Sequence, residues 1–466
     1  MLFTAPSFLF LFLPAMMAIY ALIPQNYRRY AILLFNLAYY VIAAWHQPES
    51  LLLALLTAAF TYSAGFVIAV THRRSTLLAA IAVDLAAFAI YRLTTDLPLI
   101  SRYPFGASIY LLASISYLID IYRNDAPHAK NIADLLLYMF FFPALMVGPV
   151  LRYKDFGSML DRIEFSLANV AEGIKLYVAG FLKYVAVASV LAYMLGKPEA
   201  AESASGLPVL LLLMLMTAAQ IWFALSGYSD MARGLMYMLG IPHPADFRLA
   251  HSPAEAPHRM FASLNRWVED YLVYPILRLS FLSPRVRRLL SACVICLIPA
   301  LWLRSRLFVL WPLLPILLWR CLLILRDSGH RRELSGRRLT VGRMVYSAIF
   351  LFFSVIFLFL TAMESPEHSV MLLRSAIRAA DMTVPYAIYA VLSQSTYMLV
   401  GILGLLALLL LSPAAEERIV HLPRSIGILI RSAALIAVMG CFCFSILHIL
   451  PQFPQYTSIL FAYAKI

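Results

Sequence analysis

Residues that could do chemistry gather between positions 221 and 274 of a chain that is otherwise strongly apolar. The group consists of Ser226, Tyr228, Asp230, Arg266, Trp267, Asp270 and Tyr271. Arginine in such a setting suits a phosphate or an anionic sugar. A charge at membrane depth is costly and persists where it faces a water-filled cavity or a partner. The stretch is therefore predicted to line the inside of a membrane protein, with a cytosolic loop carrying interfacial anchors as the alternative.

Structural roles for the same residues also stay open. Asp230 and Asp270 could cap helices or pair with nearby arginines, and this role is favoured over substrate binding. Arginine side chains could instead reach toward lipid headgroups. Tyr228, Trp267 and Tyr271 are of the type that anchors a protein at a membrane interface.

Composition defines the class of protein that must position these groups. Of 466 residues, 62% are hydrophobic and 13% charged, whereas soluble domains have roughly 25% charged residues. At about 20 residues per span, the chain has room for about ten or eleven. We predict an all-α polytopic membrane bundle that forms one domain over residues 1–466.

The net charge of the chain is +13. The excess of basic residues falls in short loops, as the positive-inside rule expects, and no pattern indicates nucleic-acid binding.

Apolar runs locate the predicted spans. They cover residues 7–23, 30–45, 51–70, 77–91, 132–150, 174–195, 207–223, 289–303, 307–325, 344–361, 396–411 and 428–450. The segment 104–123 is dotted with Ser and Tyr, so a helix packed inside protein or re-entrant is expected there. The basic loop 326–343 is predicted to be cytoplasmic and to meet anionic lipid headgroups. By the same rule the N-terminus is expected outside.

The five cysteines lie in apolar runs and are expected to be buried thiols rather than disulfides. Cys293 and Cys296 have the spacing of a redox or zinc pair, but no second pair follows. No metal site is predicted.

Several segments resemble the membrane-bound O-acyltransferase family, in particular the branch that acetylates exported bacterial polysaccharides, such as the alginate O-acetylases. They are Pro-Phe-Gly at 104–106 with Ser-Tyr-Leu-Ile-Asp-Ile-Tyr-Arg at 116–123, Phe-Phe-Pro at 141–143 with Gly-Pro-Val-Leu-Arg at 148–152, and Ser-Gly-Tyr-Ser-Asp-Met-Ala at 226–232. Their order and spacing together are specific. The resemblance implies that eight residues are cavity positions. They are Arg152, Ser226, Tyr228, Asp230, Arg266, Trp267, Asp270 and Tyr271.

The resemblance also implies a setting. It suggests a multi-pass protein of the bacterial cytoplasmic membrane with no bound cofactor and with acyl-CoA, chiefly acetyl-CoA, as donor. The partners expected are membrane lipids and either a periplasmic acyl-acceptor protein or polysaccharide synthase and export subunits.

Two departures from the family pattern bear on catalysis. Phe261 and Leu303 stand where the family has histidines. The histidine that Leu303 replaces is the near-invariant catalytic one of that family. Transfer of an acyl group to a sugar hydroxyl needs a base, and losing one costs on the order of a hundred- to ten-thousand-fold in rate. His258 lies nearly one helical turn before Phe261, so it is a candidate for a displaced base.

Two hypotheses for function therefore remain. The chain could take part in O-acylation of a secreted or cell-surface polysaccharide with a rewired base. Alternatively, it could be a non-catalytic subunit that scaffolds a polysaccharide biosynthesis or export complex. An ion-coupled transporter is a third class, but the sequence shows clearly neither the mid-span charges nor the inverted repeats that it would require.

Overall fold

The computed structural model describes the chain in segments. These are residues 3–45, 48–94, 106–145, 148–161, 163–195, 207–244, 246–248, 259–260, 262–303, 395–421 and 423–452. The described segments are 82% helical and contain no strand, so the predicted all-α class is confirmed. Among these segments, four helices are long and apolar enough to cross a membrane, at 48–71, 167–195, 211–238 and 425–452. The predicted spans 307–325 and 344–361 lie outside the described residues.

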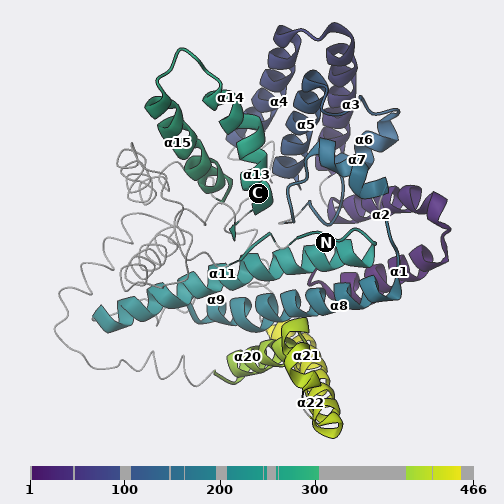
Figure 1. The fold of residues 1–466 in the computed structure, drawn as a ribbon, viewed down its shortest axis with the longest axis vertical. Coiled ribbons are helices and arrows are strands. Elements are labelled where there is room, and N and C mark those ends of the chain that lie inside the picture. The colour runs from purple at the N-terminus through teal and green to yellow at the C-terminus, as the bar shows by residue number, and fades with distance from the viewer. Residues whose placement is uncertain are drawn as a thin grey trace.

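The helices follow one another along the chain as shown in Figure 1. In order, they are η1 Phe8–Phe12, α1 Leu13–Leu22, η2 Gln25–Tyr27, α2 Arg28–Ala43, α3 Pro48–Thr71, α4 Arg74–Thr94, α5 Ala107–Arg123, α6 Ile132–Met139, α7 Tyr153–Asp161, α8 Leu167–Phe181, η3 Leu182–Ser189, α9 Val190–Leu195, α11 Leu207–Met238, α13 Ala262–Val268, η4 Glu269–Val273, α14 Tyr274–Leu277, α15 Pro284–Leu303, α20 Ser395–Leu410, α21 Pro413–Val420, α22 Arg424–Phe444, η6 Ser445–Ile449 and α23 Leu450–Gln452.

Helix α5 is the buried centre of the N-terminal group of helices. It packs against α3 and α4, and nearly every residue from Ala107 to Ile121 is buried. Gly106 begins it with a φ of +72°, a left-handed conformation that glycine adopts without steric cost. The prediction that 104–123 packs inside protein is confirmed for the described residues 106–123.

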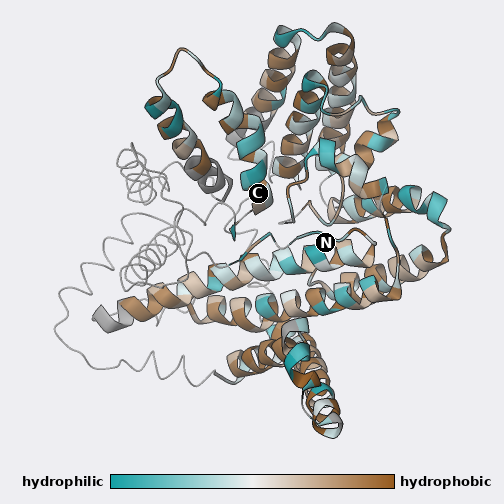
Figure 2. Cartoon of the chain, viewed as in Figure 1, coloured by the Kyte–Doolittle hydropathy of each residue, from teal (hydrophilic) through white to brown (hydrophobic). Residues whose placement is uncertain are grey.

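Helices α8 and α11 form a long antiparallel pair that lies between the group α3–α5 and the helices α20–α22 (Figure 1). Two pairs of glycines hold them together, because Gly173 faces Gly234 and Gly180 faces Gly227. Small residues at such contacts let helix backbones approach closely in a membrane. Helices α20 and α22 pack on each other, and α20 contacts η3 from the far side of this pair. Figure 2 shows that the α20–α22 hairpin is largely hydrophobic.

The predicted span 132–150 is wrong. Helix α6 ends at Met139 after 8 residues, too short for a bilayer, and the described residues 140–145 and 148–152 are not helical. Pro143 and Pro149 explain this, since proline cannot continue a helix interior. The non-helical backbone is nevertheless buried in protein, for example at Phe142 and Val150, where a membrane protein tolerates it.

Candidate functional site

Asp270 is the centre of a cluster of charges at the start of η4. Its Oδ2 lies 3.0 Å from Arg152 Nη1 and 2.5 Å from Lys154 Nζ. Arg123 Nη1 lies 3.4 Å from Oδ1, and both of its terminal nitrogens donate to the Asp270 carbonyl. The Asp270 side chain is only 11% exposed. We call Asp270 with Arg123, Arg152 and Lys154 the Asp270 cluster; it joins α5, the start of α7 and η4.

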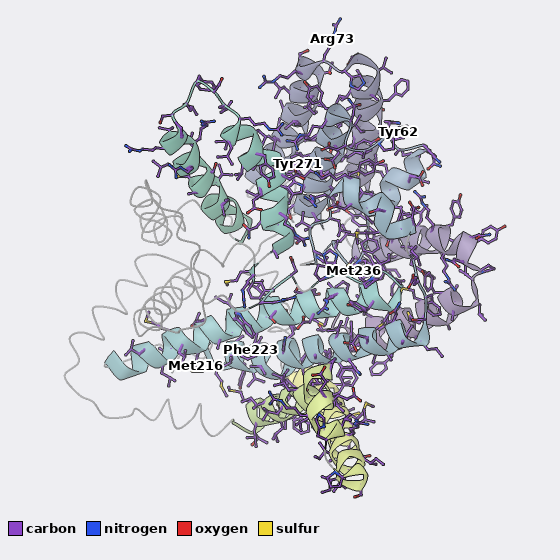
Figure 3. The ribbon with its side chains drawn as sticks, viewed as in Figure 1. Tyr62, Arg73, Met216, Phe223, Met236 and Tyr271 are labelled. Atoms are coloured by element: carbon purple, nitrogen blue, oxygen red, sulfur yellow. The ribbon has the colours of Figure 1, made fainter. Side chains whose placement is uncertain are left out.

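A second network lies beside this cluster and is fully buried. The Tyr271 hydroxyl donates to Asp120, 2.8 Å from each carboxylate oxygen, and is 2.8 Å from Ser116 Oγ. Ser116 Oγ accepts from the Tyr153 backbone, and Asp120 accepts from the Lys154 backbone. Figure 3 labels Tyr271 on the segment after α13, beside the helices that precede it in the chain. The network fixes the start of α7 against α5 and η4.

The N-terminus of α13 is attached to the loop after α11. Asp246 accepts from the Ser263 backbone and hydroxyl, at 2.5 and 2.9 Å, and so caps the helix in the way Asp does. Ser263 Oγ also accepts from the Val150 backbone at 2.8 Å. Trp267 is buried, and its indole donates to the Leu112 carbonyl. These bonds bring the segment 148–152 and α13 together around the Asp270 cluster.

Ser226 and Asp230 lie apart from this cluster, on α11. Both are bonded to Lys183 of η3, whose Nζ lies 2.5 Å from Asp230 Oδ2 and 3.1 Å from Ser226 Oγ. Lys183 and Asp230 belong to two helices that are long enough to cross a membrane. The sequence did not clearly show charges in mid-span, whereas Lys183, which was not among the predicted site residues, lies within one of these helices.

Tyr228 belongs to an aromatic core. It has no exposed surface, its ring stacks on Phe3 with centroids 5.3 Å apart, and its hydroxyl accepts from the Phe3 backbone. Tyr177 donates to the Phe3 carbonyl at 2.6 Å. Tyr228 thus holds the N-terminal segment against α8 and α11, and it does not join the Asp270 cluster.

Arg266 is exposed on α13, and its Nε bonds weakly to the Ala262 carbonyl at 3.4 Å. It lies within electrostatic range of His243, whose pKa is lowered to about 4, chiefly by burial and then by the positive charges of Arg266 and Arg233. The Nε2 atom of His243 is buried, and no partner for it is found in the part of the chain that the structure describes. Arg233 Nε donates to the His243 carbonyl and fixes this loop.

This arrangement predicts a dependence of stability on pH. Because the folded protein binds a proton at His243 less tightly than the unfolded chain does, acid favours unfolding, and stability falls as the pH drops from about 6.5 to about 4. The free energy of unfolding should fall between pH 7 and pH 4 in both chains. We expect this fall to be about 2 kcal/mol smaller in His243→Gln than in the original chain. Thermal unfolding at the two pH values measures this, with the exposed His421 changed to Gln as the control. Equal losses for both chains would contradict the prediction.

The remaining site predictions fall where the structure says little. His258 and Phe261 lie outside the described residues. Leu303 is the last residue of α15, and its side chain is outside the described part. The distances from these positions to the Asp270 cluster therefore stay untested, and so does the predicted grouping of all the motif residues around one cavity.

The sequence alone missed several members of the two networks. Asp120 and Arg123 stood in the family-like segment 116–123 and Lys154 just after another, but none of the three was predicted as a site residue. The signal that could have found them is charge balance, because a buried Asp270 requires nearby cations.

Comparison with known proteins yields relatives but no matching family model. The chain is 33% identical over 289 residues to the probable alginate O-acetylase of Pseudomonas fluorescens, covering 58% of this chain and 56% of that protein. It is 25% identical over 211 residues to a peptidoglycan O-acetyltransferase of Helicobacter pylori, covering 37% and 38%. A teichoic acid D-alanyltransferase of Streptococcus thermophilus is 26% identical over 179 residues, covering 36% and 42%. The chain thus spans little more than half the length of the alginate O-acetylase that it matches.

Proposed function

We propose that the chain is a protein of the membrane-bound O-acyltransferase type that takes part in O-acylation, chiefly acetylation, of a secreted or cell-surface polysaccharide. The three relatives described above are all named as enzymes that transfer an acyl group. Their names differ in the acceptor, which is alginate, peptidoglycan or teichoic acid. The acceptor of this chain is a bacterial exopolysaccharide or wall polymer of that kind.

The Asp270 cluster is the observation that carries the proposal. It joins Arg152 to Asp270, two of the cavity positions that the family resemblance implies. Asp270 shares the charge of its three cationic neighbours with the more exposed Asp155 and Asp125, which pair with Arg152 and Lys154. Guanidinium groups are suited to binding phosphate. The cluster can hold the phosphates of an acyl-CoA donor while Asp270 keeps the cations in place.

The reaction places one demand on the chain. The acceptor hydroxyl oxygen attacks the thioester carbonyl carbon, the carbon–sulfur bond breaks, and a base takes the hydroxyl proton while the thiolate leaves. With Phe261 and Leu303 in the histidine positions, the base is His258, His243 or a group on a partner protein. His243 has a buried Nε2 with no partner among the described residues, and its lowered pKa keeps the imidazole neutral, which supports it as the second candidate.

The setting follows from the same reasoning. The chain spans the bacterial cytoplasmic membrane, with its N-terminus outside. Acyl-CoA is supplied from the cytoplasm, and a periplasmic acyl-acceptor protein or polysaccharide synthase and export subunits receive the product. The alternative is a non-catalytic subunit that scaffolds such a complex, and the two replaced histidines favour it.

Acyl transfer by the purified chain in liposomes, with labelled acetyl-CoA, tests the proposal. Turnover that His258→Ala or His243→Gln lowers by at least a hundredfold would identify the base and exclude the scaffold. Turnover gained only by the double variant Phe261→His/Leu303→His would show a preserved site that lacks its base. Absence of turnover in every variant would reject catalysis by this chain alone and leave a base on a partner protein or the scaffold.

A further inference from the structure

The Lys183–Asp230 ion pair lies inside the helix pair, away from the Asp270 cluster. Lys183 Nζ is 2.5 Å from Asp230 Oδ2, and the two side chains are 21% and 14% exposed. Lys183 belongs to η3, a π-helical stretch of 8 residues within the long helix 167–195. Such stretches are rare and occur often at functional sites, and charged residues within membrane helices are a functional-site hypothesis by default.

The pair is not required to bring the helices together. The backbones of α8 and α11 already touch at Gly180 and Gly227, one turn from Lys183. A buried ion pair is in general no more stabilising than apolar residues of similar size. Helix packing therefore does not explain why Lys183 and Asp230 are charged, and a bound ligand would explain it.

Several polar atoms at this place have hydrogen-bonding capacity left over. An ammonium has three N–H donors, and Lys183 uses two, toward Ser226 and Asp230. Asp230 Oδ1 has no partner among the described residues, and neither does the buried indole nitrogen of Trp222.

These atoms share one face. Trp222, Ser226 and Asp230 are spaced four residues apart on α11, so they follow one side of the helix. The Lys183 ammonium lies 5.9 Å from the centre of the Trp222 ring. Phe223, labelled on the same helix in Figure 3, packs edge-on against Trp222 at 5.0 Å and holds the indole in place.

We propose that Lys183, Asp230 and Trp222 form a subsite for a sugar residue of the acceptor polysaccharide, an inference that rests on the proposed function. One hydroxyl of a vicinal diol donates to Asp230 Oδ1, and its neighbour accepts from the third N–H of Lys183. The Trp222 indole donates to a further sugar oxygen. Because the ion pair is neutral overall, the subsite selects hydroxyl groups rather than charge.

The test is binding of oligosaccharides to the full chain in nanodiscs, without any acyl donor. The probes are alginate and cellulose oligomers, each beside its fully acetylated form, which has no free hydroxyl. We expect only the hydroxyl-bearing forms to bind. Trp222→Phe should weaken binding roughly threefold to tenfold, the cost of one hydrogen bond, and Asp230→Asn by at least as much.

Two variants separate binding from folding. Exchange of the pair, Lys183→Asp with Asp230→Lys, keeps an ion pair, so it should keep the thermal midpoint but lose the sugar. The control pair is Glu172 with Lys175, 3.5 Å apart and exposed on α8, whose neutralisation should leave binding unchanged. If the exchanged chain does not fold, oligosaccharide binding by Trp222→Phe tests the subsite on its own, because that variant leaves the ion pair intact.

The outcomes distinguish this inference from the function on which it rests. Equal binding of hydroxyl-bearing and acetylated probes, or unchanged binding by Trp222→Phe, overturns the subsite. Turnover with an unchanged KM for the acceptor in Trp222→Phe overturns it as well. Sugar binding that is lost in the variants supports the subsite, even if the chain transfers no acyl group.

Discussion

Replacing Asp270 with alanine is expected to lower the free energy of unfolding by roughly 3–5 kcal/mol. The change removes the one carboxylate that Arg123, Arg152 and Lys154 share and leaves those cations partly buried without it. Denaturant titration of the protein in mixed micelles measures the loss. Any acyl-transfer activity should disappear with it, because the start of α7 and η4 would separate.

Asp155 provides the matched control for this prediction. It also pairs with Arg152, at 2.6 Å, but its side chain is 47% exposed, and such surface pairs contribute roughly 0–1 kcal/mol. Asp155→Ala should therefore leave stability nearly unchanged. Similar losses for the two alanine variants would mean that burial does not distinguish the two carboxylates and that the cluster has no central role.

Introducing leucine at Gly180 should prevent the chain from accumulating in folded form. A Cβ at this position would collide with the Gly227 carbonyl oxygen and lie 2.6 Å from the Met231 backbone nitrogen. Both obstacles are backbone, so the helices must move apart and release contacts along their length. Even modest overpacking costs about 1–3 kcal/mol, and we expect a larger loss here, measured as the monodisperse fraction on size-exclusion chromatography.

Gly440 on α22 is the control for the glycine contact. An added Cβ there meets nothing within 4 Å, and alanine is favoured over glycine in a helix by roughly 0.8–1 kcal/mol. Gly440→Ala should thus be neutral or slightly stabilising. If Gly180→Leu were tolerated as well as Gly440→Ala, the close approach of α8 and α11 would not contribute to stability.

Local sequence patterns predicted much of the fold. Apolar runs located α3, α4, α20 and α22 to within a few residues, because a helix that crosses a membrane needs an apolar run about as long as the bilayer is thick. The Ser and Tyr content of α5 correctly indicated a helix buried in protein. The run 132–150 failed because apolar composition does not distinguish a helix from a buried non-helical segment, although Pro143 and Pro149 were visible.

The site depended on contacts that local patterns do not contain. Asp270 meets Arg152 across 118 residues and Arg123 across 147, and no periodicity links such positions. Lys183 pairs with Asp230 across 47 residues, which depends on the register of two helices. The structural role favoured for Asp270, a partner of arginines, is what the structure shows, whereas Arg266, considered for anion binding, is exposed outside the cluster.

The contacts of Phe3 also constrain how the molecule is made. Phe3 is bonded through its carbonyl to Tyr177 and through its amide to Tyr228, 174 and 225 residues away. During synthesis, the segment around Phe3 must wait until α11 has been translated before it reaches its final place. Insertion of α1 and completion of its packing are therefore separate events, and a nascent chain truncated before residue 228 would leave the Phe3 segment accessible to a chaperone or protease.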